Sequence, residues 1–134
     1  MRKSCLILIA ALMGTSAHAK ASDLGGFSVS AVVPERCDIA SDALSIDPAS
    51  GEARGTLTEF CNSSRGYHIL ASHRSLAANE KVEIDFNGQS VLLSASGQSP
   101  IAFRSGPRMS REPIAVRSEN LNSDMAISLS LALY

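Results

Sequence analysis

The sequence predicts an all-β domain built as a two-layer sandwich of antiparallel sheets. Short apolar segments recur along the chain, and large apolar residues alternate in them with small or polar ones, as in strands with one buried face. Clusters of Gly, Pro, Asn and Ser separate these segments, and no helical periodicity of useful length appears after residue 20. We count about seven to nine short strands, whose spacing is typical of an immunoglobulin-like sandwich.

Residues 1–19 have the three parts of a secretory signal peptide. Two basic residues open the chain, residues 5–13 form a short apolar run, and small residues surround the end of the segment at 17–19. The apolar run is too short to span a bilayer. We therefore expect cleavage before Lys20 and one sandwich domain over residues 20–134, with no membrane span after cleavage.

The expected mature chain is mildly acidic and keeps two cysteines. Loss of the two basic residues of the leader leaves ten basic and thirteen acidic residues, a net charge of −3 with histidine neutral. This balance argues against nucleic acid and anionic membranes as partners. Cys37 and Cys61 are an even pair in an oxidising compartment, so we expect one disulfide rather than free thiols. Closing a loop of about 25 residues stabilises the fold by roughly 3 to 3.5 kcal/mol in the chain-entropy model.

The first half of the domain contains four predicted strands. They cover residues 27–33 (ended by Pro34), Cys37 to about Ile46 with a polar interruption at Ser41 and Asp42, residues 55–61, and residues 67–71. The residues expected to face the core are Phe27, Val29, Ala31, Val33, Ile39, Leu44, Ile46, Leu57, Phe60, Tyr67, Ile69 and Ala71.

The strongest local signal is a hairpin over residues 82–93. Asn87-Gly88 lies between two alternating runs, and this dipeptide tolerates positive φ at both centres of a type I′ turn. The alternation places Glu83 and Asp85 toward solvent, as solubilising residues rather than a catalytic carboxylate pair. The residues that it places toward the core are Val82, Ile84 and Phe86.

Two further strands are expected directly after prolines, over residues 101–103 after Pro100 and residues 114–116 after Pro113. A proline at the start of a strand removes no hydrogen bond from the ladder. The last strand begins at residue 125.

This last strand is the most apolar, with only Ala or Ser between its large side chains. Those side chains are Met125, Ile127, Leu129, Leu131 and Leu133. Full exposure of five such residues would forfeit about 7 to 15 kcal/mol, as much as a whole domain is usually stable by. We therefore expect an internal strand or another polypeptide to cover this strand.

No catalytic constellation, metal site or cofactor motif stands out, so we expect neither an enzyme nor a cofactor. His68 and His73 lie five residues apart on an extended segment, so they point to opposite faces and cannot share a metal. Asn62 begins a glycosylation-like tripeptide that recurs by chance. Basic residues are concentrated in one part of the sequence, at Arg104, Arg108, Arg111 and Arg117. We expect these arginines to form a solvated face rather than a site for an acidic ligand, with Glu112 and Glu119 as their counter-charges.

The ends of the expected mature chain resemble a known family. Gly25 and Gly26, the alternating segment 27–33 and then Cys37 are similar to the opening of mature chaperone-usher pilins, in which a first alternating strand runs into a cysteine. Cys61 follows at a pilin-like separation, and an apolar alternating strand ends the chain at Tyr134. The resemblance is closest to the spore coat protein U branch of archaic fimbriae.

The resemblance implies an incomplete immunoglobulin-like sandwich that lacks its last strand. A periplasmic pilus chaperone first supplies that strand, and the N-terminal extension of the next pilin subunit replaces it during assembly at an outer-membrane usher. It implies that the five apolar residues of the last strand line an acceptor groove. The residues that would form either the subunit's first strand or the strand donated to a neighbour are Phe27, Val29, Ala31 and Val33.

The expected function is therefore that of a structural subunit of a secreted fibre or pilus, found in the periplasm and then at the cell surface, with a role in adhesion and biofilm formation. The alternative is a self-contained secreted sandwich that binds a ligand through its loops.

Overall fold

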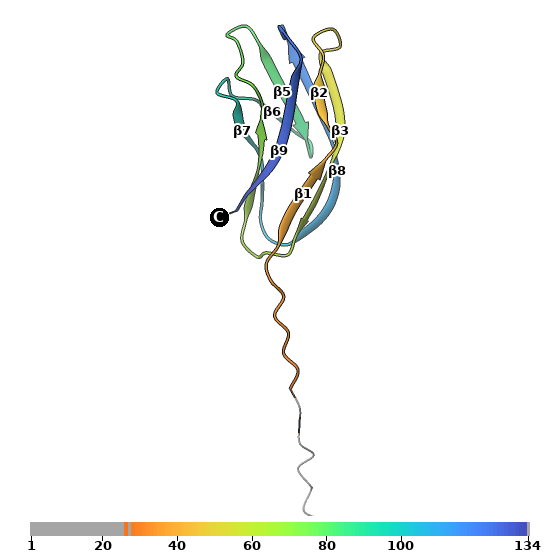
Figure 1. Ribbon diagram of the computed structural model, residues 1–134, viewed down its shortest axis with the longest axis vertical. Coiled ribbons are helices and arrows are strands. Elements are labelled where there is room, and N and C mark those ends of the chain that lie inside the picture. Colours follow the sequence, from red (N-terminus) through yellow and green to blue (C-terminus); the bar gives the residue numbers. More distant parts are fainter. Residues whose placement is uncertain (1–25, 27, 134) are drawn as a thin grey trace, which may run out of the picture. The chain divides into compact units, whose positions relative to one another are not determined.

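Nine β-strands form two antiparallel sheets in the part of the chain that the structure describes (Figure 1). The structure is a computed structural model that describes residue 26 and residues 28–133. The chain divides into two units, residues 1–32 and residues 33–134. In the first unit, the described residues are exposed and none lies in a strand.

The first sheet has five strands in the order β1-β3-β8-β5-β6. These strands are β1 (Cys37–Ser41), β3 (Glu52–Cys61), β8 (Arg108–Glu119), β5 (Lys81–Phe86) and β6 (Gln89–Leu92). The predicted hairpin is confirmed as β5 and β6. Asn87 and Gly88 at its turn have φ of 52° and 74°, as a type I′ turn requires.

The second sheet has four strands in the order β2-β9-β4-β7. These strands are β2 (Leu44–Ile46), β9 (Met125–Leu133), β4 (Tyr67–Ser72) and β7 (Gln98–Arg104). The single strand predicted from Cys37 to Ile46 is thus divided between the sheets. The chain changes sheet at Asp42, whose carboxylate accepts a hydrogen bond from the Thr56 amide of β3 at 2.8 Å.

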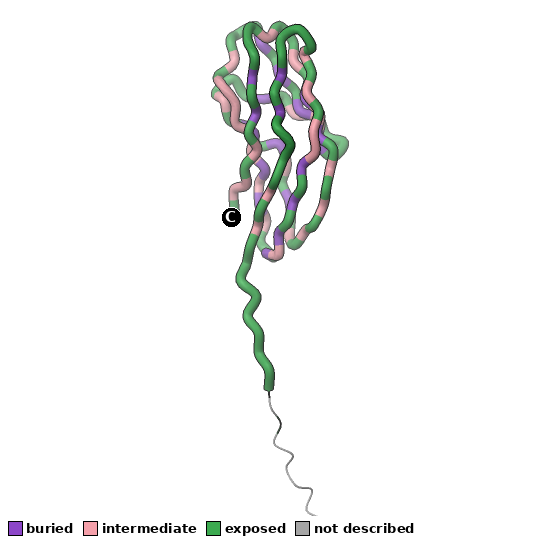
Figure 2. The backbone as a smooth tube through the Cα atoms, turned by 45° about the vertical axis from the view of Figure 1, so that its right-hand side comes forward, coloured by how far each residue is buried: buried purple, intermediate pink, exposed green. Residues whose placement is uncertain are grey.

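The core lies between the two sheets and consists of the side chains that alternate inward along the strands (Figure 2, buried positions in purple). Val82, Ile84 and Phe86 of β5 are all buried, as predicted. The other buried apolar residues are Leu44, Ile46, Leu57, Cys61, Tyr67, Ile69, Ala71, Leu93, Ile101, Ile114, Val116, Met125 and Ile127. The all-β sandwich predicted from the sequence is therefore the fold of the described residues.

Two prolines lie inside strands rather than before them. Pro100 is in the edge strand β7, beside an irregularity in its pairing with β4, where a missing donor can face away from the sheet. Pro113 lies in the central strand β8 and pairs with Thr56 of β3, but pairing of β8 with β5 begins only at Ile114. Each strand can therefore continue through its proline, so the predicted starts at residues 101 and 114 were wrong.

Two other expectations also differ from the structure. Residues 28–33 form no strand and are exposed, while Phe27 lies outside the described residues. Phe60, expected to anchor the core with Leu57, is exposed, because neighbouring residues of a strand point to opposite faces and Glu59 takes the inward place.

Candidate functional site

The terminal strand β9 is paired along each part of its length by a different neighbour. Residues 125–127 pair with β2, and residues 128–133 pair with β4. On the side away from β4, residues 128–133 have no strand partner among the described residues. Backbone N–H and C=O groups on such an edge are a template for the addition of another strand.

The large apolar side chains of β9 also become more exposed toward the C-terminal end of the strand. Met125 and Ile127 are 1% and 5% exposed, Leu129 and Leu131 are half-buried, and Leu133 is 56% exposed. The sequence predicted that all five would need covering by a neighbour. The structure restricts this need to the last three, because the core between β2 and the opposite sheet already covers the first two.

Strand β1 provides the opposite wall of this open edge. It is the edge strand of the first sheet and lies close to β9. Cys37 and Ile39 of β1 are half-buried and pack against the core, as do Leu129 and Leu131. We call these four residues, together with Leu133, the open seam. It runs between the two sheet edges toward the end of the sandwich where β1 begins and β9 ends (Figure 1).

A buried charged cluster lies beside the end of the open seam. Glu59 of β3 is fully buried, and its carboxylate accepts hydrogen bonds from the hydroxyl of Tyr67 at 2.8 Å and from the guanidinium of Arg104 at 3.1 Å. Ser110 donates to it at 3.4 Å, and Arg108 lies 3.9 Å away. The pKa of Tyr67 is raised to about 12, mainly because the hydroxyl is buried and secondly because it donates a hydrogen bond to Glu59. Tyr67 is also the β4 residue directly opposite Leu133 of β9, so the cluster fixes the strand that supports the seam.

The four predicted basic residues do not form one face. Arg104 and Arg108 turn inward to Glu59, whereas Arg117 pairs with Asp85 on the outer face of the first sheet, and Arg111 is exposed. Sequence reasoning missed the role of Glu59. The signal was present, because Glu59 has the same parity along its strand as Leu57 and Cys61.

A second buried carboxylate positions the loop from which β9 starts. Glu80 accepts hydrogen bonds from both terminal guanidinium nitrogens of Arg74 at 2.7 Å, and from the amides of Ala77 and Asn122 at 2.8 Å. The Arg74 guanidinium and then the two amides lower the pKa of Glu80 to about 2. Glu80 thus joins the loop after β4 to the loop before β9. Local sequence patterns do not predict that these two loops lie close together.

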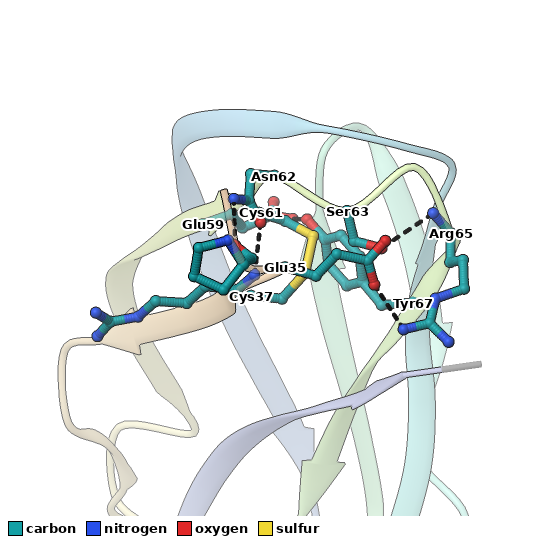
Figure 3. Close-up of a disulfide and its surroundings, with 10 residues drawn as sticks. Glu35, Cys37, Glu59, Cys61, Asn62, Ser63, Arg65 and Tyr67 are labelled. Carbon is teal, nitrogen blue, oxygen red and sulfur yellow. Dashed lines mark hydrogen bonds and ion pairs between the residues drawn. A yellow bond between two sulfur atoms is a disulfide. The ribbon is translucent and has the colours of Figure 1, made fainter. Parts of the chain in front are cut away.

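The predicted disulfide is formed between Cys37 and Cys61, which stand opposite each other in the β1–β3 pair (Figure 3). It fastens the strand that carries one wall of the open seam to the body of the first sheet. Among the described residues, no group of three or more His, Cys, Asp and Glu side chains could hold a metal ion. The ring of His68 lies against that of Phe103, with the centroids 5.2 Å apart and the two planes tilted by 51°.

A cavity of about 810 Å³ lies on the outer face of the first sheet. Glu52, Glu83, Asp85 and Arg117 are among the residues that line it. Lys81 and Glu119 also line it and pair with each other, Arg117 pairs with Asp85, and Glu83 accepts a hydrogen bond from Ser90. This shallow, charged hollow differs in character from the apolar open seam.

No helix in the described part of the chain is long and apolar enough to cross a membrane. Comparison with protein-family models, with curated proteins and with solved structures found no match to this chain.

Proposed function

We propose that this chain is a structural, pilin-like subunit of a secreted surface fibre, whose second sheet is completed by a strand from another polypeptide. The observation that carries the proposal is the side of residues 128–133 of β9 that has no strand partner among the described residues, with Leu129, Leu131 and Leu133 incompletely covered beside it. An added strand would satisfy the backbone edge through main-chain hydrogen bonds, and its alternate side chains would fill the open seam.

Covering this edge would contribute free energy that favours strand addition. Leu133 is 56% exposed and two further leucines are partly exposed, so covering them contributes roughly 1 to 4 kcal/mol, if complete burial of one leucine contributes about 1.5 to 3 kcal/mol. Each added backbone hydrogen bond contributes about 0.5 to 1.5 kcal/mol more. The sum is a large share of the 5 to 15 kcal/mol or so by which a domain is usually stable.

The chain itself contains a suitable donor. Val29 and Val33 are 83% and 75% exposed, and residues 28–33 are in no strand. With Phe27 and Ala31 they make an alternating apolar segment in the sequence. We propose that this segment is donated to a neighbouring subunit. A periplasmic chaperone would occupy the open seam beforehand, and an outer-membrane usher would mediate the exchange.

This proposal assigns no catalytic role to the chain and places it in the periplasm and then in an extracellular fibre with an adhesive role.

The test is a titration of the purified protein, residues 20–134, with a synthetic peptide of residues 26–34. We expect the peptide to raise the melting temperature, because it binds the folded state alone. A peptide with Val29→Asp and Val33→Asp is the matched control and should have no effect. A stable monomer whose melting temperature is the same with either peptide would refute the proposal.

One observation favours a second function, that of a self-contained binding module. The cavity on the outer face, lined by Glu52, Glu83, Asp85 and Arg117, is far more polar than the open seam and would suit a small polar ligand. A module of this kind needs no added strand, so the same peptide titration separates the two functions.

A further inference from the structure

Residues 34–36, which lead into β1, are held to the first sheet by the side chain of one asparagine (Figure 3). The Oδ1 atom of Asn62 accepts a hydrogen bond from the Arg36 amide at 2.5 Å, and its Nδ2 donates to the Pro34 carbonyl at 2.9 Å. The Asn62 amide also donates to the Arg36 carbonyl at 3.0 Å. Asn62 thus continues the β1–β3 pairing beyond Cys61 and gives the Pro34 carbonyl a donor.

An ion pair and a buried serine strengthen this fastening. Arg65 donates to the Glu35 carboxylate at 2.6 Å. The Arg65 amide donates to Ser63 Oγ at 3.1 Å, and Ser63 is buried, so the turn that carries both Asn62 and Arg65 is itself fixed. The Cys37–Cys61 disulfide lies directly beside it. We call Asn62, Arg65 and Glu35 the clamp.

The clamp sets the direction of the chain at residues 34–36. They continue the line of β1, because Arg36 and Asn62 extend the register in which Cys37 faces Cys61. Strand β9 runs the opposite way and ends where β1 begins, since Leu133 faces Tyr67, and a short turn joins Tyr67 to Cys61. For the polypeptide before residue 34 to pair with β9 of its own subunit, the chain would have to reverse direction at the clamped residues.

Length alone does not prevent such a reversal. The eight residues 26–33 can extend over about 26 Å, and six residues of strand edge occupy only about 20 Å. Self-insertion would therefore close the open seam of a single subunit and remove it from assembly. The hydrogen bonds of the clamp oppose this, because all three involving the backbone of residues 34–36 depend on those residues staying in line with β1.

We propose that the clamp prevents the N-terminal segment from inserting into its own subunit and so reserves the open seam for the same segment of a second copy. This inference rests on the proposed function and goes beyond it by naming the residues that decide between self-insertion and exchange. Their role is positioning, since neither Asn62 nor Arg65 belongs to the open seam.

The experiment measures amide hydrogen exchange of residues 28–33 and 128–133 in the protein of residues 20–134, at low and at high protein concentration. The variants are Arg65→Ala, which removes only an exposed ion pair, Asn62→Ala and the double variant. Lys81→Ala, which removes the exposed Lys81–Glu119 pair elsewhere on the sheet, is the control. Circular dichroism verifies that each variant is folded, and Arg65→Ala keeps the test decisive if loss of Asn62 prevents folding.

We expect wild type and Lys81→Ala to protect residues 28–33, and the amides of residues 128–133 that are not bonded to β4, only at high concentration, through contacts between copies. In the clamp variants, exchange in both segments should slow by about tenfold or more at low concentration, with a monomeric mass. Protection that stays concentration-dependent in every variant would overturn the clamp and leave the proposed function standing. Protection of residues 28–33 in monomeric wild type would also overturn the clamp. If neither segment is ever protected in any protein, the proposed function itself fails.

Discussion

Replacement of Glu59 by alanine tests whether the buried charged cluster holds the two sheets together beside the open seam. Glu59 lies in the first sheet, and its partners Tyr67 and Arg104 lie in the second, so the cluster is a polar bridge through the core. The variant would leave Arg104, which is only 8% exposed, without its carboxylate. Breaking a buried ion pair in this way costs about 3 to 5 kcal/mol, a large part of the stability of a domain.

The assay is urea unfolding at neutral pH followed by circular dichroism, with the free energy of unfolding extrapolated to water. We expect Glu59→Ala to lose about 3 to 5 kcal/mol or to be unfolded, and Glu59→Met with Arg104→Met to recover most of that loss, because an apolar pair leaves no charge unpaired. Glu112→Ala is the control, since Glu112 pairs with Arg108 in a half-exposed position. A loss below about 1 kcal/mol in Glu59→Ala would refute the structural role of the cluster.

Three further predictions concern the disulfide, the open seam and acid stability. Cys37→Ser should lose about 2 to 5 kcal/mol in urea unfolding, and reductant should lower the wild-type stability equally; identical curves with and without reductant would contradict this. Leu133→Asp should reduce polymer yield by about tenfold or more without lowering the melting temperature of the monomer, whereas Leu92→Asp, at an equally exposed leucine of β6, should polymerise normally. Equal yields from the two would count against the seam. Because the pKa of Glu80 falls from 4.5 in the unfolded chain to about 2, its stabilising contribution is complete above pH 4.5 and is lost as the pH falls toward 2. Glu80→Gln should flatten that part of the pH profile, and an unaltered profile would refute the assignment.

Local patterns in the sequence were sufficient where one residue pair or one alternation determines the structure. Asn87-Gly88 determines the β5–β6 hairpin, and the alternation from Met125 to Leu133 determines β9. The lone cysteine pair of the domain led to the correct disulfide. The hairpin and β9 depend on residues that are close in sequence, and the disulfide has only one possible pairing in the domain. The sequence alone therefore predicts these features.

Features that depend on strand order were not predictable in this way. Pro113 is tolerated in a central strand only because β5 begins to pair one residue later, and Glu59 is tolerated in the core only because Arg104 approaches from the other sheet. Asn62 becomes a clamp only when the register of β1 against β3 places Pro34 and Arg36 beside it. Each needs a partner that is remote in sequence, and no alternation or turn signal specifies that partner.

Only part of the edge of β9 is open to an added strand among the described residues. The pattern from Met125 to Leu133 suggested five side chains in need of cover, but β2 pairs with the first part of the strand, and only the second part lacks a partner on that side within the described chain. Residues 28–33 are not used as a first strand, because β1 begins at Cys37. A spare alternating segment and an open edge of similar length therefore occur in one chain.

The most direct test of this account is amide hydrogen exchange of residues 128–133 in the monomeric protein, with and without the peptide of residues 26–34. Our account predicts rapid exchange of the amides on the side away from β4 in the free monomer and slow exchange when the peptide is bound, while the amides bonded to β4 stay protected throughout. Protection of every one of these amides in the free monomer, or exchange that the peptide leaves unchanged, would contradict the claim that β9 accepts a strand.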